Sequence, residues 1–122
     1  MIVALTLLAG AAGAVARFVL DSAVKRRWRT TFPWATVTIN LTGSFVLGLL
    51  AGLVIFDGQP TAWQTVLGTG FCGGYTTFST ASFETVRLVQ QGRRGVALAN
   101  ALGSLVGSVA ACAAGLALAW AL

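Results

Sequence analysis

The side chains of this chain that could do chemistry are mostly neutral hydroxyls and amides, spaced regularly within long apolar segments. One set comprises Thr36, Asn40 and Ser44, and a second comprises Asn100, Ser104 and Ser108. Residues four apart share one face of a helix, and polar side chains in a membrane helix face a bundle interior or a pathway. A row of neutral donors can replace the water around a small anion without trapping it, as permeation requires. The alternative is ordinary hydrogen bonding between helices, worth about 0.6 kcal/mol per bond.

A third polar group follows a run of glycines. Residues 68–77 read GTGFCGGYTT, and Ser79 and Thr80 come soon after. Such sequence forms helix poorly, so we expect a helix break, and broken backbone inside a membrane often binds ions. The competing interpretation is that the glycines only permit close helix packing, as we expect for the pairs Gly48/Gly52 and Gly103/Gly107.

Few residues suit other chemistries. The chain has no histidine, and Cys72 and Cys112 lie far apart in apolar segments, where small buried hydrophobic residues are expected. A proton-coupled pump would need an acid or base in its path, for which Glu84 is the candidate. The net charge of +5 does not indicate nucleic-acid binding, because the basic residues lie at the ends of apolar segments. No nucleophile–base pair or metal-ligand set indicates an enzyme.

The elements that must position the polar residues are predicted to be transmembrane helices. Of the 122 residues, 57% are hydrophobic and 9% are charged, which leaves too little polar surface for a soluble domain. About 20 apolar residues in a helix cross the hydrocarbon core of a bilayer. We predict a single all-α membrane domain, residues 1–122, of four transmembrane helices at about 2–24, 33–56, 63–90 and 95–121, with the third helix broken in mid-membrane.

The basic residues gather in two of the three predicted loops. These two loops, after the first and third helices, lie on the same side and contain Lys25, Arg26, Arg27, Arg29, Arg93 and Arg94. The loop on the other side has Asp57 and no Lys or Arg. The positive-inside rule therefore places the basic loops in the cytoplasm and both termini outside. Within the first helix, the spacing of Arg17 and Asp21 predicts an i,i+4 ion pair.

Three segments together resemble the Fluc/CrcB family of fluoride channels. They are residues 13–17 (GAVAR), residues 33–45 (PWATVTINLTGSF) and residues 70–80 (GFCGGYTTFST), of which the last is highly specific. The resemblance covers the whole chain, including its length and helix count. It implies passive export of fluoride across a microbial cell membrane by a small antiparallel dimer, with two pores and one sodium ion (Na+) buried at the dimer centre.

The resemblance also assigns roles to residues. The carbonyls of Gly73 and Thr76 would hold the sodium ion, in agreement with its preference for oxygen ligands, and each subunit of a two-fold dimer would supply half of the cage. Phe78 matches a ring whose positively polarised edge meets fluoride. Further positions on the fluoride route would be Asn40, Asn100, Ser104 and Ser108, with Thr77 and Ser79 as additional donors. Possible supporting residues are Arg17, Thr36, Ser44, Thr80 and Glu84. For Arg17 the alternative is extension toward the membrane interface with Asp21 as its partner.

One departure from the family pattern concerns the pore. The family has a second phenylalanine three residues after the first, and this chain has Ala81. Phe83 lies about 200° around the helix from that position and cannot replace it. Together with the unequal loop charges, Ala81 favours pairing with a paralogue of opposite topology, since a hetero-dimer can keep one working pore. Pairing with itself, a non-conducting assembly subunit and a small multidrug transporter are the alternatives. A transporter would need a membrane-embedded carboxylate in the first helix, where only Asp21 occurs.

Overall fold

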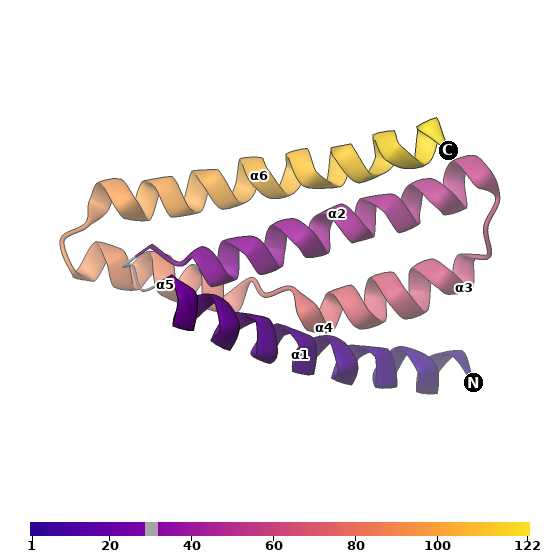
Figure 1. The fold of residues 1–122 in the computed structure, drawn as a ribbon, viewed down its shortest axis with the longest axis horizontal. Coiled ribbons are helices and arrows are strands. Elements are labelled where there is room, and N and C mark those ends of the chain that lie inside the picture. Colours follow the sequence, from indigo (N-terminus) through magenta and orange to yellow (C-terminus); the bar gives the residue numbers. More distant parts are fainter. Residues whose placement is uncertain (29–31) are drawn as a thin grey trace.

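The computed structural model describes residues 1–28 and 32–122, and the described chain consists of helices joined by short connections. Three long helices are α1 (Ile2–Arg27), α2 (Trp34–Asp57) and α6 (Arg94–Ala121). Between α2 and α6 lie α3 (Thr61–Trp63), the π-helix η1 (Gln64–Cys72), α4 (Gly73–Tyr75) and α5 (Ser79–Gln90). Both termini lie at one end of the bundle, and the α1–α2 and α5–α6 connections lie at the other (Figure 1). Arg29, predicted in the first basic loop, falls outside the described residues.

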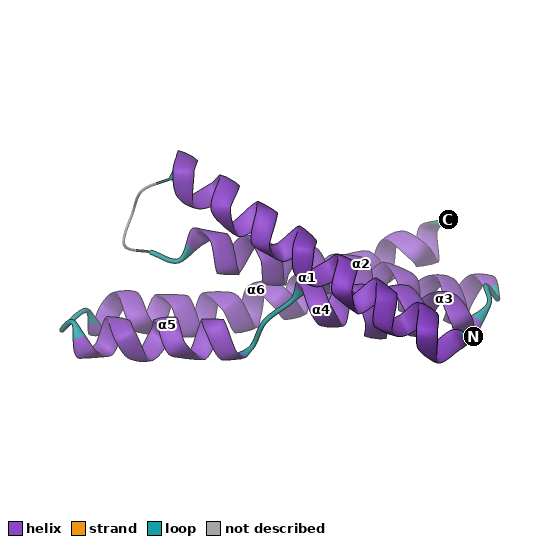
Figure 2. Ribbon diagram, turned by 90° about the horizontal axis from the view of Figure 1, so that it is seen from below, coloured by secondary structure: helices purple, strands orange, loops and turns teal. Residues whose placement is uncertain are grey.

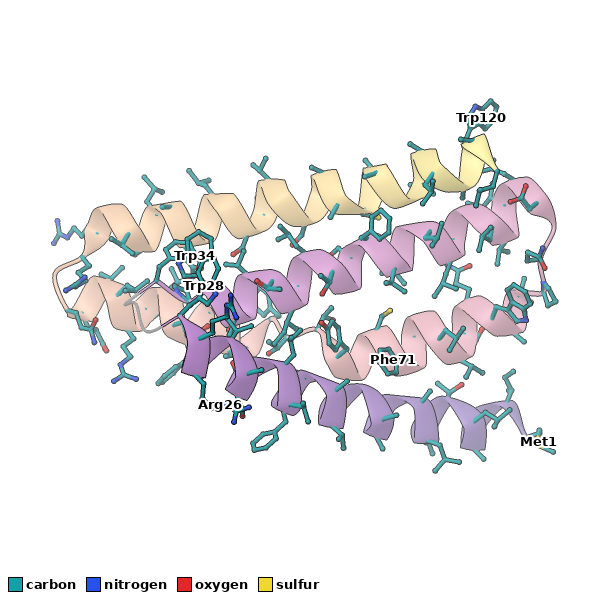
Figure 3. All side chains as sticks on the ribbon, viewed as in Figure 1. Met1, Arg26, Trp28, Trp34, Phe71 and Trp120 are labelled. Carbon is teal, nitrogen blue, oxygen red and sulfur yellow. The ribbon has the colours of Figure 1, made fainter. Side chains whose placement is uncertain are left out.

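Three of the helices are long and apolar enough to cross a membrane. The most apolar windows of α1, α2 and α6 have mean hydropathies of 2.0, 2.1 and 1.9. Aromatic rings mark both ends of the bundle, as is typical of membrane interfaces: Trp28 and Trp34 at the basic end and Trp120 at the other (Figure 3). The fourth predicted span, residues 63–90, is helical from Thr61 to Tyr75 through α3, η1 and α4, and after an interruption it continues as α5.

Glycines let α1 cross close over η1 and α4 (Figure 2). A Cβ atom on Gly13 would overlap the carbonyl of Phe71, and one on Gly74 would overlap the carbonyl of Gly10. Such backbone-to-backbone contact is how membrane helices associate where no hydrophobic effect drives them together. Close helix packing therefore accounts for some of the glycines in residues 68–77, the segment where the sequence predicted a helix break.

The second extensive contact joins α2 to α6 along most of their length. A Cβ on Gly48 would overlap the carbonyl of Cys112, and one on Gly52 would overlap the Ala119 side chain, so the predicted packing role of this pair is confirmed. The other predicted pair behaves differently. Gly107 faces the Leu41 side chain, whereas no atom of the described chain lies within 4 Å of a Cβ built on Gly103. The packing prediction is wrong for Gly103 within one subunit.

Candidate ion site and polar grooves

The backbone leaves the helical conformation over a short stretch between α4 and α5. Thr76 is extended, with φ −81° and ψ 161°, and α5 begins three residues later, at Ser79. The glycine run before it stays helical as η1 and α4, where its small residues are needed for contact with α1. The interruption is therefore shorter than residues 68–77 and falls on the threonines.

The interruption leaves several carbonyls without their helical donors, among them those of Gly73 and Thr76. In a continuous α-helix, the N–H of Thr77 would bond the Gly73 carbonyl, and the N–H of Thr80 would bond the Thr76 carbonyl. Instead, the Thr77 N–H donates to Asn40 Oδ1 at 2.9 Å, and the Thr80 N–H donates to Thr77 Oγ1 at 3.1 Å. Side chains have taken both donors, so the Gly73 and Thr76 carbonyls can accept from another group or bind a cation.

Asn40 holds the interruption from the neighbouring helix. Besides accepting from the Thr77 N–H, its Nδ2 donates to the Thr77 carbonyl at 2.9 Å. One amide side chain thus satisfies both backbone groups of Thr77, which the interruption would otherwise leave unpaired. The sequence predicted Asn40 as a lining residue, and the structure adds a direct role in fixing the backbone.

Two largely apolar grooves that carry several polar side chains meet beside this interruption. The α5–α6 groove has a volume of about 470 Å³ and is lined by Asn40, Thr77, Phe78, Ala81, Ser82, Thr85, Val86, Asn100, Ala101, Ser104, Leu105 and Ser108. The α2–η1 groove, of about 490 Å³, is lined by Asn40, Gly43, Ser44, Leu47, Gly68, Thr69, Cys72, Gly73, Thr76, Thr77, Phe78 and Ser108. Four residues belong to both: Asn40, Thr77, Phe78 and Ser108. Phe78 is 86% exposed in the single subunit, so its ring is available to a neighbouring group.

A hydrogen-bonded chain fixes the polar wall of the α5–α6 groove. Asn100 is 1% exposed, and its Nδ2 donates to Thr85 Oγ1 at 2.7 Å. Ser104 Oγ donates to Asn100 Oδ1 at 3.5 Å. The three predicted positions on α6 therefore line one groove together, with Ser108 at its junction with the other groove. The sequence reasoning missed Ser82 and Thr85, although their spacing from Phe78 places them on the same face of α5.

The predicted stripe on α2 does not face a single cavity. Thr36 is 2% exposed and opens onto a separate space of about 160 Å³, the α1 crevice, which is lined by Arg17, Phe18, Asp21, Lys25, Thr36, Ile39, Thr77 and Thr80. Ser44 lines the α2–η1 groove instead. Thr80 likewise belongs to the α1 crevice. Ser79 is exposed and approaches the Thr77 hydroxyl at 3.4 Å.

The predicted ion pair between Arg17 and Asp21 is wrong. Asp21 pairs with Lys25 at 3.0 Å, one helical turn in the other direction. An acid that precedes its base by four residues has the more favourable orientation along a helix. Arg17 makes no ion pair with the described residues and is left half-buried on the wall of the α1 crevice.

Glu84 lies at the basic end of the bundle. It lines a pocket of about 290 Å³ with Lys25, Arg87, Gln91 and several aromatic residues. Its Oε1 is buried and has no hydrogen-bond partner among the described residues. Within the described chain, no three His, Cys, Asp or Glu side chains come together as a metal site.

Known proteins are similar to this chain along most of its length. A family model described as "CrcB-like protein, Camphor Resistance (CrcB)" matches residues 4–116. The "Fluoride-specific ion channel FluC 1" of Leifsonia xyli subsp. xyli is 48% identical over 116 residues, covering 95% of this chain and 85% of the relative. A protein of the same name from Frankia casuarinae is 45% identical over 121 residues, covering 94% and 93%. "Fluoride-specific ion channel FluC 2" of Cutibacterium acnes is 45% identical over 112 residues, covering 91% of each chain.

Proposed function

The chain belongs to the CrcB-like protein family, and from this premise we propose that it is a subunit of a membrane channel through which fluoride leaves the cell passively. The observation that carries the proposal is the 48% identity, over 95% of this chain, to a protein named as a fluoride-specific ion channel. A channel subunit, rather than an enzyme, also agrees with the uncharged lining of the two grooves, which is apolar with a few hydroxyls and amides.

The fluoride route that we propose runs along the α5–α6 groove and past the residues that both grooves share. Ser108 and the second amide hydrogen of Asn100 would donate hydrogen bonds to the ion, and Ser104 would do so by giving up its long 3.5 Å bond to Asn100, so that the hydration of the ion is replaced in steps. None of the residues lining this groove is charged, so no group there would bind the anion too tightly to release it. At the junction, the polarised edge of the Phe78 ring would face the ion, and Thr77 and Ser79 would supply further hydroxyls.

Basic side chains at one end of the bundle would draw fluoride toward this route. Lys25 and Arg87 line the basic-end pocket, and a cleft of one charge sign raises the local concentration of the opposite ion. Arg17, which has no ion-pair partner among the described residues, lies in the α1 crevice with Thr36 and Thr80. That crevice reaches Thr77, a residue of both grooves, so we propose it as a side access for the anion. Glu84 would support this end of the pathway.

A structural sodium ion fits the interrupted helix. Carbonyl oxygens are hard ligands of the kind that such a cation prefers, and the Gly73 and Thr76 carbonyls have both lost their helical donors. A second subunit related by a two-fold axis would bring the equivalent pair to the same centre. We therefore propose that the break lies in mid-membrane, at the centre of an antiparallel dimer, where it would hold Na+ between the subunits.

We propose that the dimer partner is a paralogue of opposite topology. Both basic connections lie at the same end of the bundle (Figure 1), which favours one orientation, with these loops in the cytoplasm and both termini outside. Relatives numbered both FluC 1 and FluC 2 are similar to this chain, as expected where two such chains occur together. Pairing of the chain with itself would require insertion in both orientations, against this charge bias.

A second candidate function is supported by Ala81. This residue lines the α5–α6 groove where the family pattern has a ring, and under this second proposal the pore on this face is lost while the partner conducts. In that case the chain is a non-conducting assembly subunit of the channel. The small multidrug transporter considered from the sequence is not retained, because the family is a different one and Asp21 is paired with Lys25 near the end of α1.

Growth in fluoride tests the proposal in cells. A bacterial strain that lacks its own fluoride exporter would express this chain alone, its paralogue alone, or both. We expect fluoride-resistant growth with both chains, and loss of resistance when Phe78→Ala is combined with the corresponding change in the paralogue. Absence of rescue by the two chains, when both are present in the membrane, would contradict the proposed function. Equal rescue by this chain alone would contradict the hetero-dimer.

A further inference from the structure

Three residues of α2 contact three consecutive residues at the interrupted helix. Asn40 bonds both backbone groups of Thr77. A Cβ on Gly43 would overlap the Thr76 methyl group, so the bare backbone of α2 lies directly against Thr76. On the other side of Thr76, the Tyr75 hydroxyl lies 2.9 Å from Thr42 Oγ1. The extended residue is thus held between two hydrogen-bonded neighbours.

The direction of the Thr42–Tyr75 hydrogen bond follows from the hydrogens available. Thr42 has one hydroxyl hydrogen, which it donates to the Thr38 carbonyl at 2.8 Å, with the Ile39 carbonyl at 3.1 Å. Tyr75 must therefore be the donor and Thr42 Oγ1 the acceptor. The Tyr75 ring also stacks on Phe71, with centroids 5.9 Å apart and planes inclined by 17°. A fixed ring and a single available acceptor give this hydrogen bond a defined geometry.

From this arrangement we infer that Tyr75 and Thr42 are positioning residues that set the place of the Thr76 carbonyl and thereby the preference of the site for sodium over potassium. The inference rests on the sodium site of the proposed function. Neither side chain touches the ion. Their effect is transmitted through one peptide unit, because Tyr75 immediately precedes Thr76 while Asn40 fixes the residue after it.

The spacing of carbonyl ligands distinguishes cations of different size. In the size-fit account of carbonyl cages, which this inference adopts, carbonyls held at fixed positions favour the ion whose radius matches the cage. Loss of the Tyr75 contact would remove one of the restraints on the Thr76 carbonyl. The remaining ones are Thr77, the packing on Gly43, and the bonds that the Thr76 N–H and hydroxyl donate to the Cys72 carbonyl at 2.9 and 2.8 Å. The smaller ion should then bind more weakly, and the larger ion should be accepted almost as well.

The experiment measures cation-dependent thermal stability of the purified dimer in detergent, with sodium or potassium added to a buffer of a large organic cation. Tyr75→Phe keeps the ring and removes the donor, and Thr42→Val removes the acceptor. We expect the sodium concentration for half-maximal stabilisation to rise roughly threefold in Tyr75→Phe, the effect of one interhelical hydrogen bond. In Thr42→Val the rise should be about five- to tenfold, because the Tyr75 hydroxyl is also left without an acceptor.

The double variant gives the sharpest test. With both hydroxyls removed no donor is left unpaired, so the double variant should return to the value of Tyr75→Phe rather than show the product of the two effects. Thr42→Ser keeps the acceptor and should match the unaltered protein. Thr65→Val is a matched control, because that hydroxyl bonds only the Thr61 carbonyl of its own segment, at 3.3 Å. In both hydroxyl-deleted single variants, the ratio of potassium to sodium half-saturation values should fall.

The possible results separate this inference from the function it rests on. Sodium-specific stabilisation of the unaltered protein, with no change in either single variant, would overturn the positioning role and leave the sodium site intact. Absence of any sodium-specific stabilisation in the unaltered protein would overturn the sodium site itself and the inference with it. Multiplicative effects in the double variant would show that Thr42 and Tyr75 act separately, which contradicts the inference.

Discussion

Replacement of Asn40 by leucine should destabilise the protein more than the same replacement at any other amide of the bundle. The Asn40 side chain makes two hydrogen bonds of 2.9 Å, to the N–H and the carbonyl of Thr77. Leucine has a similar volume but can make neither bond, so two backbone groups lose their partners. Each unsatisfied group in a buried setting costs about 1–3 kcal/mol. The site is only partly buried, and we expect a loss of about 2–4 kcal/mol in the free energy of unfolding.

Asn100→Leu is the matched control. Asn100 is more deeply buried than Asn40, yet its amide bonds only the side chains of Thr85 and Ser104. The Thr85 hydroxyl still donates to the Ala81 carbonyl when Asn100 is removed. No backbone group is left unpaired, so the loss should be about 1 kcal/mol, the value of a typical hydrogen bond.

Reversible denaturation in mixed detergent micelles measures both free energies, and amide hydrogen exchange locates the effect. In Asn40→Leu the Thr77 and Thr80 amides should exchange faster, because Asn40 binds the first directly and Thr77 Oγ1 accepts from the second. In Asn100→Leu their exchange should not change. If the two variants lose equal stability, or if Thr77 exchange is unaffected by Asn40→Leu, the claim that Asn40 holds the interruption is refuted.

Three further predictions concern packing, the pore and orientation. Gly48→Leu should lower the free energy of unfolding by several kcal/mol, because the new side chain would overlap the Cys112 backbone. Gly103→Leu should change that free energy in an isolated subunit by no more than about 0.5 kcal/mol. Similar losses in both variants would contradict the packing account. Ala81→Phe should raise fluoride efflux through the pore on this face about fivefold, equivalent to one aromatic contact of about 1 kcal/mol, and unchanged or reduced efflux would argue against a missing ring. Cysteines introduced at Lys25 and Asp57 should react with a membrane-impermeant maleimide from opposite sides, and comparable labelling of each from both sides would exclude a fixed orientation.

Hydropathy alone predicted the long helices, because it reports where the chain must satisfy its backbone hydrogen bonds internally. Hydropathy does not predict where a helix ends outside the hydrocarbon core of the membrane, and α1 ends at Arg27 rather than near residue 24. The three basic residues in its last turn favour helix there, since positive charge stabilises a helix C-terminus. The glycine run predicted an interruption, but its exact place at Thr76 and Thr77 depends on the hydrogen bonds from Asn40 of α2, which the local sequence does not contain.

The polar stripes show a similar limit for the candidate site. Four-residue spacing correctly grouped Asn100, Ser104 and Ser108 along one groove. On α2 the same spacing did not predict that Thr36 would face a different cavity from Ser44. Spacing shows which residues share one side of a helix, but it does not show which neighbouring helix packs there. Asp21 had possible partners one turn away on both sides, and the preferred order of acid before base was the available signal for Lys25.

Fluoride efflux from liposomes that contain the purified chain and its opposite-topology paralogue tests the central claim most directly. A fluoride electrode and a chloride electrode would follow the two ions from identical vesicles. We expect rapid loss of fluoride, no loss of chloride, and no transport of either ion from vesicles without protein. Retention of fluoride by vesicles containing the folded dimer, or equal passage of chloride, would contradict the assignment of this chain to a fluoride-selective channel.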